Sequence, residues 1–367
     1  MKKILSIALV LALVLSFGVT AFADTQTGNP ANKEQTMPAN QQNTIEITKY
    51  YKLTGDDTAK SPAETITFTA EKTDIENPGV KPGTQEPYTV ETMPAIVSVT
   101  LPPYSEGAAV STGNGSESKL SVVLPAYDAV GVYTYTITEA DGNKAGVVYG
   151  ANTNPIKLVV TVTQAPATET ESNPGLLVIA GIHAEAADSS TKTDTFTNTY
   201  SAGKLSVSKT VTGNMGDKSL YFDFEVTFTA PTTGTAQDVV GAPVTITGAT
   251  GPSDTENPTT IATTEWSSGS VTKTFKLKDG DTLTFENLPA GVEYTVTETA
   301  VTGYTTTKSG DSGTIAANAT STAAFTNDKT ADIDTGISLD SLPYILIVAV
   351  VLGAAVVMFV NKRRSEV

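Results

Sequence analysis

A lysine, a glutamate and an asparagine occur in the same order at two places in this chain. The two sets are Lys49, Glu139 and Asn198, and Lys209, Glu298 and Asn327. The lysine lies 90 residues before the glutamate in the first set (139 − 49) and 89 residues before it in the second (298 − 209). A neutral lysine amine is a nucleophile, and it can attack the carbonyl carbon of an asparagine carboxamide. Each set therefore contains the groups needed to form a new amide bond.

All six residues fall where a strand pattern places core side chains. Alternate residues of a strand share a face, so Lys49 shares its face with Ile45 and Ile47. Burial without partners costs several kcal/mol for an ionised group, and it lowers the pKa of lysine and raises that of glutamate. We therefore predict that the neutral lysine attacks the asparagine side chain and releases ammonia. The protonated glutamate is expected to donate a hydrogen bond to the asparagine carbonyl oxygen and to shuttle protons.

The alternative for each residue taken singly is structural. A lysine in apolar phase often packs its stem at a sheet edge and keeps its ammonium group in water. Lys273 is such a case, since it shares its phase with Phe275 and Leu277 and has no sign of a role. A glutamate that ends a strand is usually solvated. The repetition of the ordered set, at nearly equal spacing, favours chemistry over this alternative.

The elements that would position these residues are strands. Runs rich in Val, Thr, Ile, Tyr and Phe alternate between clusters of Gly, Pro, Asn and Asp. The predicted strands include 65–70, 120–124, 132–139, 156–163, 222–229, 271–277 and 282–285. Asp279-Gly280 is a hairpin signal between the last two, and the Pro-, Gly- and Thr-rich stretches 73–87 and 231–260 are predicted loops. The fold class is all-β, with two tandem sandwich domains over 44–202 and 203–330.

Both ends of the chain have targeting features. Residues 1–23 resemble a secretory signal peptide with an Ala21-Phe22-Ala23 cleavage site, and 24–43 are predicted to be a disordered leader. An apolar run over 342–360 is long enough to cross a membrane, and the tail 361–367 is basic, which places it in the cytoplasm. The chain is therefore expected to be exported and held at its C-terminus.

Composition narrows the class of function. The net charge of −16 disfavours nucleic acid and anionic membrane surfaces as partners. The chain has no cysteine, so an exported protein of this size needs its core or another cross-link for stability. The one histidine, His183, has no companion ligands in the sequence, and no cofactor or metal site is expected. We therefore do not expect an enzyme that acts on external substrates; the expected chemistry is self-cross-linking.

The repeats resemble the isopeptide-bonded pilin domains of Gram-positive surface fibres, and the pair resembles a major pilin of the streptococcal T-antigen type. The residues that carry this resemblance are Ile137-Thr138-Glu139 and Phe196-Thr197-Asn198 in the first repeat, and Asn287–Gly291 and Tyr294–Glu298 in the second. The resemblance implies Ig-like, Cna-B-like sandwiches. It also implies bonds from Lys49 to Asn198 and from Lys209 to Asn327, with Glu139 and Glu298 as the catalytic residues.

Residues 331–336 resemble a sortase sorting signal, because Thr335-Gly336 precedes an apolar span and a basic tail. The resemblance implies cleavage between Thr335 and Gly336. The departure from the usual signal is that Asp334 stands where a proline is common. A protein anchored in the membrane without cleavage is the alternative.

By the same resemblance, Lys192 is the acceptor on the next subunit, although it could also be an ordinary loop lysine. The implied partners are sortase, identical subunits, peptidoglycan and a host surface receptor. The implied location is the cell wall or a surface pilus of a Gram-positive bacterium. A monomeric wall-anchored adhesin or a minor pilin with the same domains is the competing function.

Overall fold

The computed structural model of the protein describes residues 37–55, 58–151, 154–165, 176–189, 191–233, 236–253, 256–331 and 342–365. The predicted signal peptide over 1–23 and the predicted cleavage site at Thr335 and Gly336 lie outside these residues. Within them the protein is built from strands, apart from one long helix and a short 3₁₀ helix. The all-β prediction is confirmed.

The first domain contains two five-stranded sheets, with strand orders β1-β9-β8-β6-β3 and β4-β5-β2-β10-β7. Their strands are β1 (Met37–Pro38), β2 (Asn43–Leu53), β3 (Phe68–Glu76), β4 (Ser98–Thr100), β5 (Ser116–Leu124), β6 (Gly131–Glu139), β7 (Val147–Val148), β8 (Ile156–Gln164), β9 (Leu177–Ala186) and β10 (Thr195–Tyr200). Inward residues of both sheets, among them Ile47, Tyr135, Leu158 and Phe196, form one buried core. The alternating pattern of β6, in which every second residue is buried, is the period-two signal of a strand with one face on the core.

The second domain pairs a six-stranded sheet, β16-β15-β18-β11-β22-β20, with a four-stranded sheet, β17-β12-β19-β21, and adds a small ribbon, β13-β14. The bounds are β11 (Ala202–Thr212), β12 (Phe222–Thr229), β13 (Thr232–Thr233), β14 (Ala236–Gln237), β15 (Val244–Gly248), β16 (Thr260–Ile261), η2 (Thr263–Glu265), β17 (Ser270–Leu277), β18 (Thr282–Pro289), β19 (Glu293–Glu298), β20 (Thr305–Ser309), β21 (Ser312–Thr314) and β22 (Thr320–Asp328). Phe224, Phe275, Phe285 and Phe325 dominate its core.

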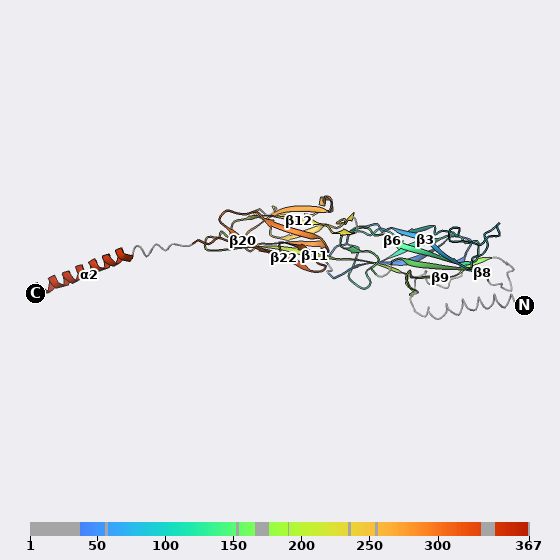
Figure 1. Ribbon diagram of the computed structural model, residues 1–367, viewed down its shortest axis with the longest axis horizontal. Helices are drawn as coiled ribbons and strands as arrows, with labels where there is room; N and C mark the ends of the chain where they lie inside the picture. The colour runs from blue at the N-terminus through green and yellow to red at the C-terminus, as the bar shows by residue number, and fades with distance from the viewer. Residues whose placement is uncertain are drawn as a thin grey trace.

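The two domains lie end to end (Figure 1), and a single residue, Ser201, separates β10 from β11. The Ser201 N–H donates to Gly146 O in the first domain at 2.9 Å, and its carbonyl accepts from Ala290 N in the second at 3.0 Å. The Asn287 side chain adds two bonds to the backbone of Lys60, at 3.0 and 3.1 Å. Both backbone groups of the linker are therefore occupied, so the join has little freedom of its own.

Three local predictions were wrong. Asp279-Gly280 is not a hairpin: β17 and β18 belong to different sheets, and the turn crosses between them. The turn is tied to β11 instead, because the Val211 N–H donates to Asp279 Oδ1 at 2.7 Å and the Gly280 N–H donates to Lys209 O at 3.0 Å. A two-residue turn signal does not report which sheet the next strand joins.

The other two corrections concern segments predicted to lack regular structure. The leader predicted over 24–43 pairs with the sheet near its end, since Met37 and Pro38 lie opposite Ile179 and Val178. The predicted loop over 73–87 begins inside β3, and the one over 231–260 contains β13 to β15 and the start of β16. Thr-rich segments favour strands when a neighbouring strand offers backbone partners, and that neighbour is not visible in the local sequence.

The C-terminal helix α2 spans Leu342–Ser365. Its segment Pro343–Arg364 is long and apolar enough to cross a membrane, with a mean hydropathy of 2.7 over an 18-residue window. Lys362, Arg363 and Arg364 occupy its last turn. The predicted span over 342–360 thus lies within a helix that continues into the basic tail.

Candidate functional site

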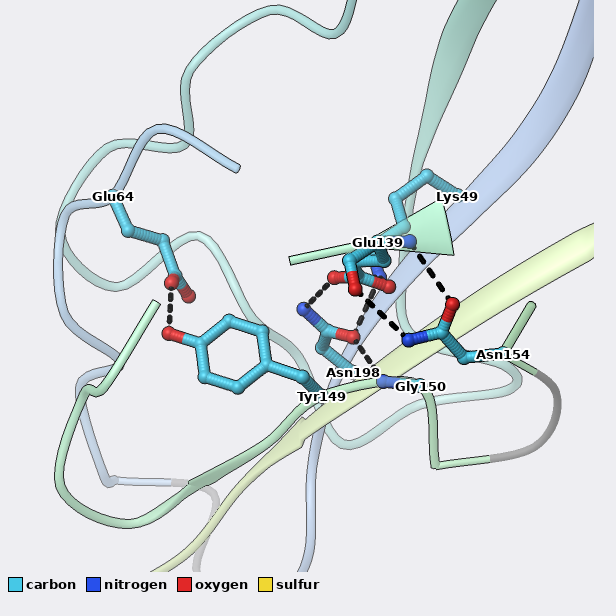
Figure 2. A network of polar contacts seen from close by, with 7 residues as sticks. All are labelled: Lys49, Glu64, Glu139, Tyr149, Gly150, Asn154 and Asn198. Carbon is cyan, nitrogen blue, oxygen red and sulfur yellow. Dashed lines mark hydrogen bonds and ion pairs between the residues drawn. The ribbon is translucent and has the colours of Figure 1, made fainter. Parts of the chain in front are cut away.

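The first triad is positioned by the register of three strands. The first and last long strands, β2 and β10, are parallel neighbours, with Lys49 opposite Phe196 and Tyr51 opposite Asn198. Asn198 therefore lies two residues further along its strand than the position opposite Lys49, and both side chains are on the same inward face. Glu139 is the last residue of β6 in the facing sheet. The three side chains meet between the sheets (Figure 2).

The contacts within this triad are short and direct. Lys49 Nζ lies 2.7 Å from Glu139 Oε2, 2.8 Å from Oε1 and 2.6 Å from Asn198 Oδ1. Asn198 Nδ2 donates to Glu139 Oε1 at 2.6 Å. Lys49 and Asn198 are fully buried, and Glu139 is 3% exposed. The amine, the carboxylate and both ends of the carboxamide therefore lie within hydrogen-bond distance in one water-poor pocket.

One detail differs from the expected geometry. We expected the glutamate to hydrogen-bond the asparagine carbonyl oxygen, but Glu139 contacts the amide nitrogen, which is the leaving group. The Gly150 N–H donates to Asn198 Oδ1 at 2.9 Å. A backbone N–H can bond an oxygen but not an NH₂ group, so Gly150 fixes which way the carboxamide points. Glu139 is consequently placed to receive a proton from the lysine and to deliver it to the departing nitrogen.

The segment around Gly150 also holds Glu139. The Asn154 carboxamide bonds the Glu139 backbone twice: Glu139 N donates to Asn154 Oδ1 at 2.9 Å, and Asn154 Nδ2 donates to Glu139 O at 3.0 Å. The sequence reasoning missed Gly150 and Asn154. The available signal was the Tyr149-Gly150 pair, which ends in a residue that tolerates the left-handed backbone found here (φ +58°).

The second triad repeats the arrangement. Lys209 on β11 lies opposite Phe325 on the parallel strand β22, and Val211 lies opposite Asn327. Lys209 Nζ lies 3.1 and 3.0 Å from the two oxygens of Glu298 on β19. The Asn327 amide nitrogen also donates to Glu298 Oε1. The structure thus brings together all six residues predicted from the repeated order.

The two triads differ at the carbonyl oxygen. Asn327 Oδ1 is buried and has no hydrogen-bond partner among the described residues, whereas Asn198 Oδ1 has two. A buried carbonyl oxygen without a partner has lost its hydrogen bonds to water and gained none in the protein, which costs free energy. The first site is the more completely bonded of the two.

Aromatic rings line both sites in the same way. In the first domain, the rings of Phe68 and Phe196 meet edge to face at 5.2 Å, and these residues lie opposite Glu139 and Lys49 in register. In the second domain, Phe224 and Phe325 meet at the same distance, opposite Glu298 and Lys209. The rings exclude water, and Phe222 adds a cation–π contact, with Lys209 Nζ 4.1 Å from its ring centroid.

Burial favours the neutral forms of Lys49, Glu139 and Lys209. It lowers the pKa of Lys49 to about 8, although the attraction of Glu139 opposes this. It raises the pKa of Glu139, against the hydrogen bonds from Lys49 and Asn198. Burial also lowers the pKa of Lys209. These shifts bring the pKa of the lysine closer to that of the glutamate. A proton then passes more easily from the amine to the carboxylate, which leaves the lysine neutral and nucleophilic.

The remaining predicted residues lie apart from the triads. Lys192 is 40% exposed at the side chain, and its ammonium group pairs with Glu185 Oε2 at 3.2 Å. His183 Nε2 lies 3.8 Å from the same oxygen. Lys273 pairs with Glu265 at the surface of the second domain, in keeping with a structural role. In the part of the chain that the structure describes, no group of three His, Cys, Asp or Glu side chains could hold a metal ion.

Comparison with known proteins gives matches for both domains. A family model described as "Spy0128-like isopeptide containing domain" matches residues 45–201, and one described as "Domain of unknown function (DUF7601)" matches 203–329. A protein named "Pilin" from Streptococcus pyogenes serotype M1 is 30% identical over 256 residues, which cover 65% of this chain and 69% of that protein. The "Pilus tip adhesin Cpa" of Streptococcus pyogenes is 30% identical over 143 residues, or 37% of this chain and 18% of that protein.

Among solved structures, the major pilin from Streptococcus pyogenes aligns with 23% sequence identity and a TM-score of 0.45. The alignment covers 78% of this chain and 99% of that one.

Proposed function

This chain belongs to the pilin family of isopeptide-containing surface proteins, and from that premise we propose that it is a structural subunit of a cell-surface pilus. Its partners in the fibre are further copies of the same chain. The match to the pilin covers 69% of that protein, whereas the match to the tip adhesin covers 18% of that one. This difference favours a structural subunit over the alternative of a minor pilin or a monomeric adhesin.

Each domain cross-links itself. The observation that carries this proposal is the buried contact of Lys49 Nζ with both Glu139 and Asn198. In the second domain Glu298 likewise bonds both Lys209 and Asn327. The neutral lysine attacks Cγ of the asparagine, and a new N–C bond forms. The glutamate takes the proton that Nζ loses and passes it to Nδ2. The C–N bond to Nδ2 then breaks and ammonia leaves, so one carboxamide becomes one secondary amide without a cofactor.

The cross-links protect a fold that has no disulfides. Each bond joins the first and last long strands of its domain, which are already parallel neighbours. The bond therefore closes a loop of more than 100 residues in the unfolded chain without distorting the sheet. In this proposal the only chemistry of the protein is performed on itself.

Polymerisation is proposed to use sortase. The enzyme cleaves between Thr335 and Gly336 and transfers the Thr335 acyl group to Lys192 of the next subunit, and the last subunit joins peptidoglycan in the cell wall. The exposed position of Lys192 supports its role as acceptor. A host surface receptor is a further partner in this proposal.

The polymer claim is tested with two lysines that share one carboxylate. Lys192 and Lys157 both pair with Glu185 at 3.2 Å, but only Lys192 is the proposed acceptor. In cells with the cognate sortase, K192A should abolish the ladder of polymers that resists boiling in detergent, and K157A should preserve it. A ladder that persists in K192A would exclude Lys192 as acceptor, and wall extracts of the wild type that contain monomer alone would exclude the fibre.

A further inference from the structure

Glu64 and Tyr149 form a hydrogen bond beside the first triad and take no direct part in the proposed cross-linking reaction. Tyr149 donates its hydroxyl hydrogen to Glu64 Oε2 at 2.6 Å. Glu64 is 7% exposed, and its backbone is bridged to Tyr104 by two hydrogen bonds of 3.0 and 2.9 Å. A short bond from a phenol to a carboxylate on a fixed backbone is a strong anchor. The residue that follows Tyr149 is Gly150, whose N–H faces the reacting carboxamide (Figure 2).

The backbone on both sides of Gly150 is also fixed to the strand that carries Asn198. Val147 and Val148 pair with Tyr200 and Thr199. Beyond Gly150, the Ala151 N–H donates to Thr197 O at 2.7 Å. The Gly150 N–H is thus held between two backbone attachments and one side-chain anchor.

Gly150 is also constrained in shape. Its φ of +58° is in the left-handed region, and a Cβ placed on it would lie 2.5 Å from Asn154 Cβ. The close packing against Asn154 keeps the N–H 2.9 Å from Asn198 Oδ1.

We propose that the Gly150 N–H is an oxyanion donor for cross-link formation in the first domain, and that Glu64 and Tyr149 are positioning residues that hold it. This inference rests on the proposed cross-linking reaction. When Lys49 Nζ attacks Asn198 Cγ, the pair of electrons of the carbonyl π bond moves to Oδ1, which becomes negative. The Gly150 N–H already points at that atom and stabilises the charge without reorganisation. The charge returns to the carbonyl bond when Nδ2 leaves with the proton from Glu139.

Within the described part of the second domain, no equivalent donor is present. Asn327 Oδ1 has no hydrogen-bond partner among the described residues. The strand next to Asn327 in the sheet is β20, where Thr306 lies opposite Asn327 in a regular antiparallel pair. The first cross-link therefore has a stabilising contact that the second lacks. The second cross-link serves as an internal reference in the same molecule.

The direct test replaces the Gly150 N–H with an ester oxygen, which cannot donate a hydrogen bond. The full-length chain is made by cell-free synthesis in detergent micelles, with glycolic acid in place of Gly150, so that an ester replaces the amide between residues 149 and 150. Intact mass and peptide mapping over time should show the Lys49–Asn198 bond forming roughly 10²–10³-fold more slowly, while Lys209–Asn327 forms at its normal rate. Formation of the first bond at the normal rate would overturn the proposal.

The matched control is an ester one residue later. Lactic acid in place of Ala151 removes the hydrogen bond to Thr197 from the same segment but leaves Oδ1 untouched. This chain should form the first cross-link at nearly the wild-type rate. Equal slowing by both esters would mean that the segment is needed only for structure, and the donor role would be rejected.

The positioning residues are tested by a conservative rescue. Y149F and E64A each remove the contact that anchors Tyr149, so both should slow the first cross-link by about tenfold. E64Q keeps an oxygen that accepts from the Tyr149 hydroxyl, so it should restore most of the rate. If E64Q is as slow as E64A, or if Y149F reacts at the normal rate, the anchoring role fails. If the unsubstituted chain loses no ammonia at Lys49 and Asn198, the proposed cross-linking itself fails.

Discussion

Lys49 Nζ lies 2.6 Å from Asn198 Oδ1, although 149 residues separate them in the chain. The proximity follows from the parallel pairing of β2 and β10, which places the two residues one step apart on the same face. The strand neighbours already enforce this contact, so a covalent bond between the two side chains adds little strain to the native state. Its effect falls on the unfolded chain and on the path that a pulling force takes.

Loss of one cross-link should lower the stability of its own domain. N327A removes the second bond, which closes a loop of more than 100 residues, and the loop-entropy relation for cross-links predicts a loss of about 4–5 kcal/mol. Denaturant unfolding followed by tryptophan fluorescence reports this domain, because Trp266 packs against its core. The control T306A changes an exposed residue that lies opposite Asn327 in the same sheet, and it should leave the midpoint almost unchanged. An N327A protein with the wild-type midpoint would contradict the prediction.

Cross-link formation in the first domain should accelerate as the pH rises. Burial lowers the pKa of Lys49 to about 8, so the amine is largely protonated and unreactive below this pH and neutral above it. The initial rate of bond formation after refolding of unbonded chain should therefore rise between pH 6 and 8 and then level off. Intact mass at fixed times measures it. A rate that is constant across this range, or that falls, would show that the lysine is not the titrating nucleophile.

Force along a fibre should load the two cross-links unequally. If Thr335 of one subunit is joined to Lys192 of the next, tension enters at Lys192, runs along β10 and through Ser201 into β11, and reaches Lys209. There the second cross-link transfers it to Asn327 and the C-terminal segment. The first cross-link lies beside this path, because Lys49 belongs to a strand that the tension does not follow.

Single-molecule stretching between residues 192 and 335 tests this unequal loading. N327A should release the roughly 118 residues between Lys209 and Asn327, an extension of roughly 400 Å when the domain unfolds. N198A should produce no comparable step at the same force. Equal steps in both variants would contradict the proposed path.

The join between the domains should be stiff, and Asn287 should contribute to the stiffness. Its carboxamide bonds both backbone groups of Lys60, and its backbone has a left-handed φ of +66°. N287G keeps this conformation accessible and removes only the side-chain bonds. Small-angle scattering of N287G should show a broader distribution of lengths than the wild type. Identical curves would place the stiffness in the Ser201 backbone alone.

The triads could be predicted from the sequence because lysine, glutamate and asparagine recur at strand positions whose pattern is otherwise apolar and inward-facing. This pattern predicts all six residues and the two-sheet architecture needed to bring them together. It did not predict the direction of the carboxamide. That direction depends on the Gly150 N–H. Every residue except proline has a backbone N–H, so the residue type does not reveal which one acts as a donor.

The errors in strand assignment have a related cause. The Asp279-Gly280 turn has a hairpin sequence but joins different sheets, because Asp279 bonds β11 rather than closing a ladder. Polar local composition predicts that Met37 and Pro38 belong to the leader, yet β9 supplies their backbone partners. Long-range pairing decided both cases, and it is not encoded within a short window of sequence.

The central claim is that each domain forms one lysine–asparagine bond with loss of ammonia, and the intact mass of residues 24–335 tests it most directly. The account predicts a mass lower than that of the unmodified chain by two ammonia molecules. E139A and E298A should each restore one of them, and the double variant both. A wild-type protein with the full unmodified mass would contradict the account.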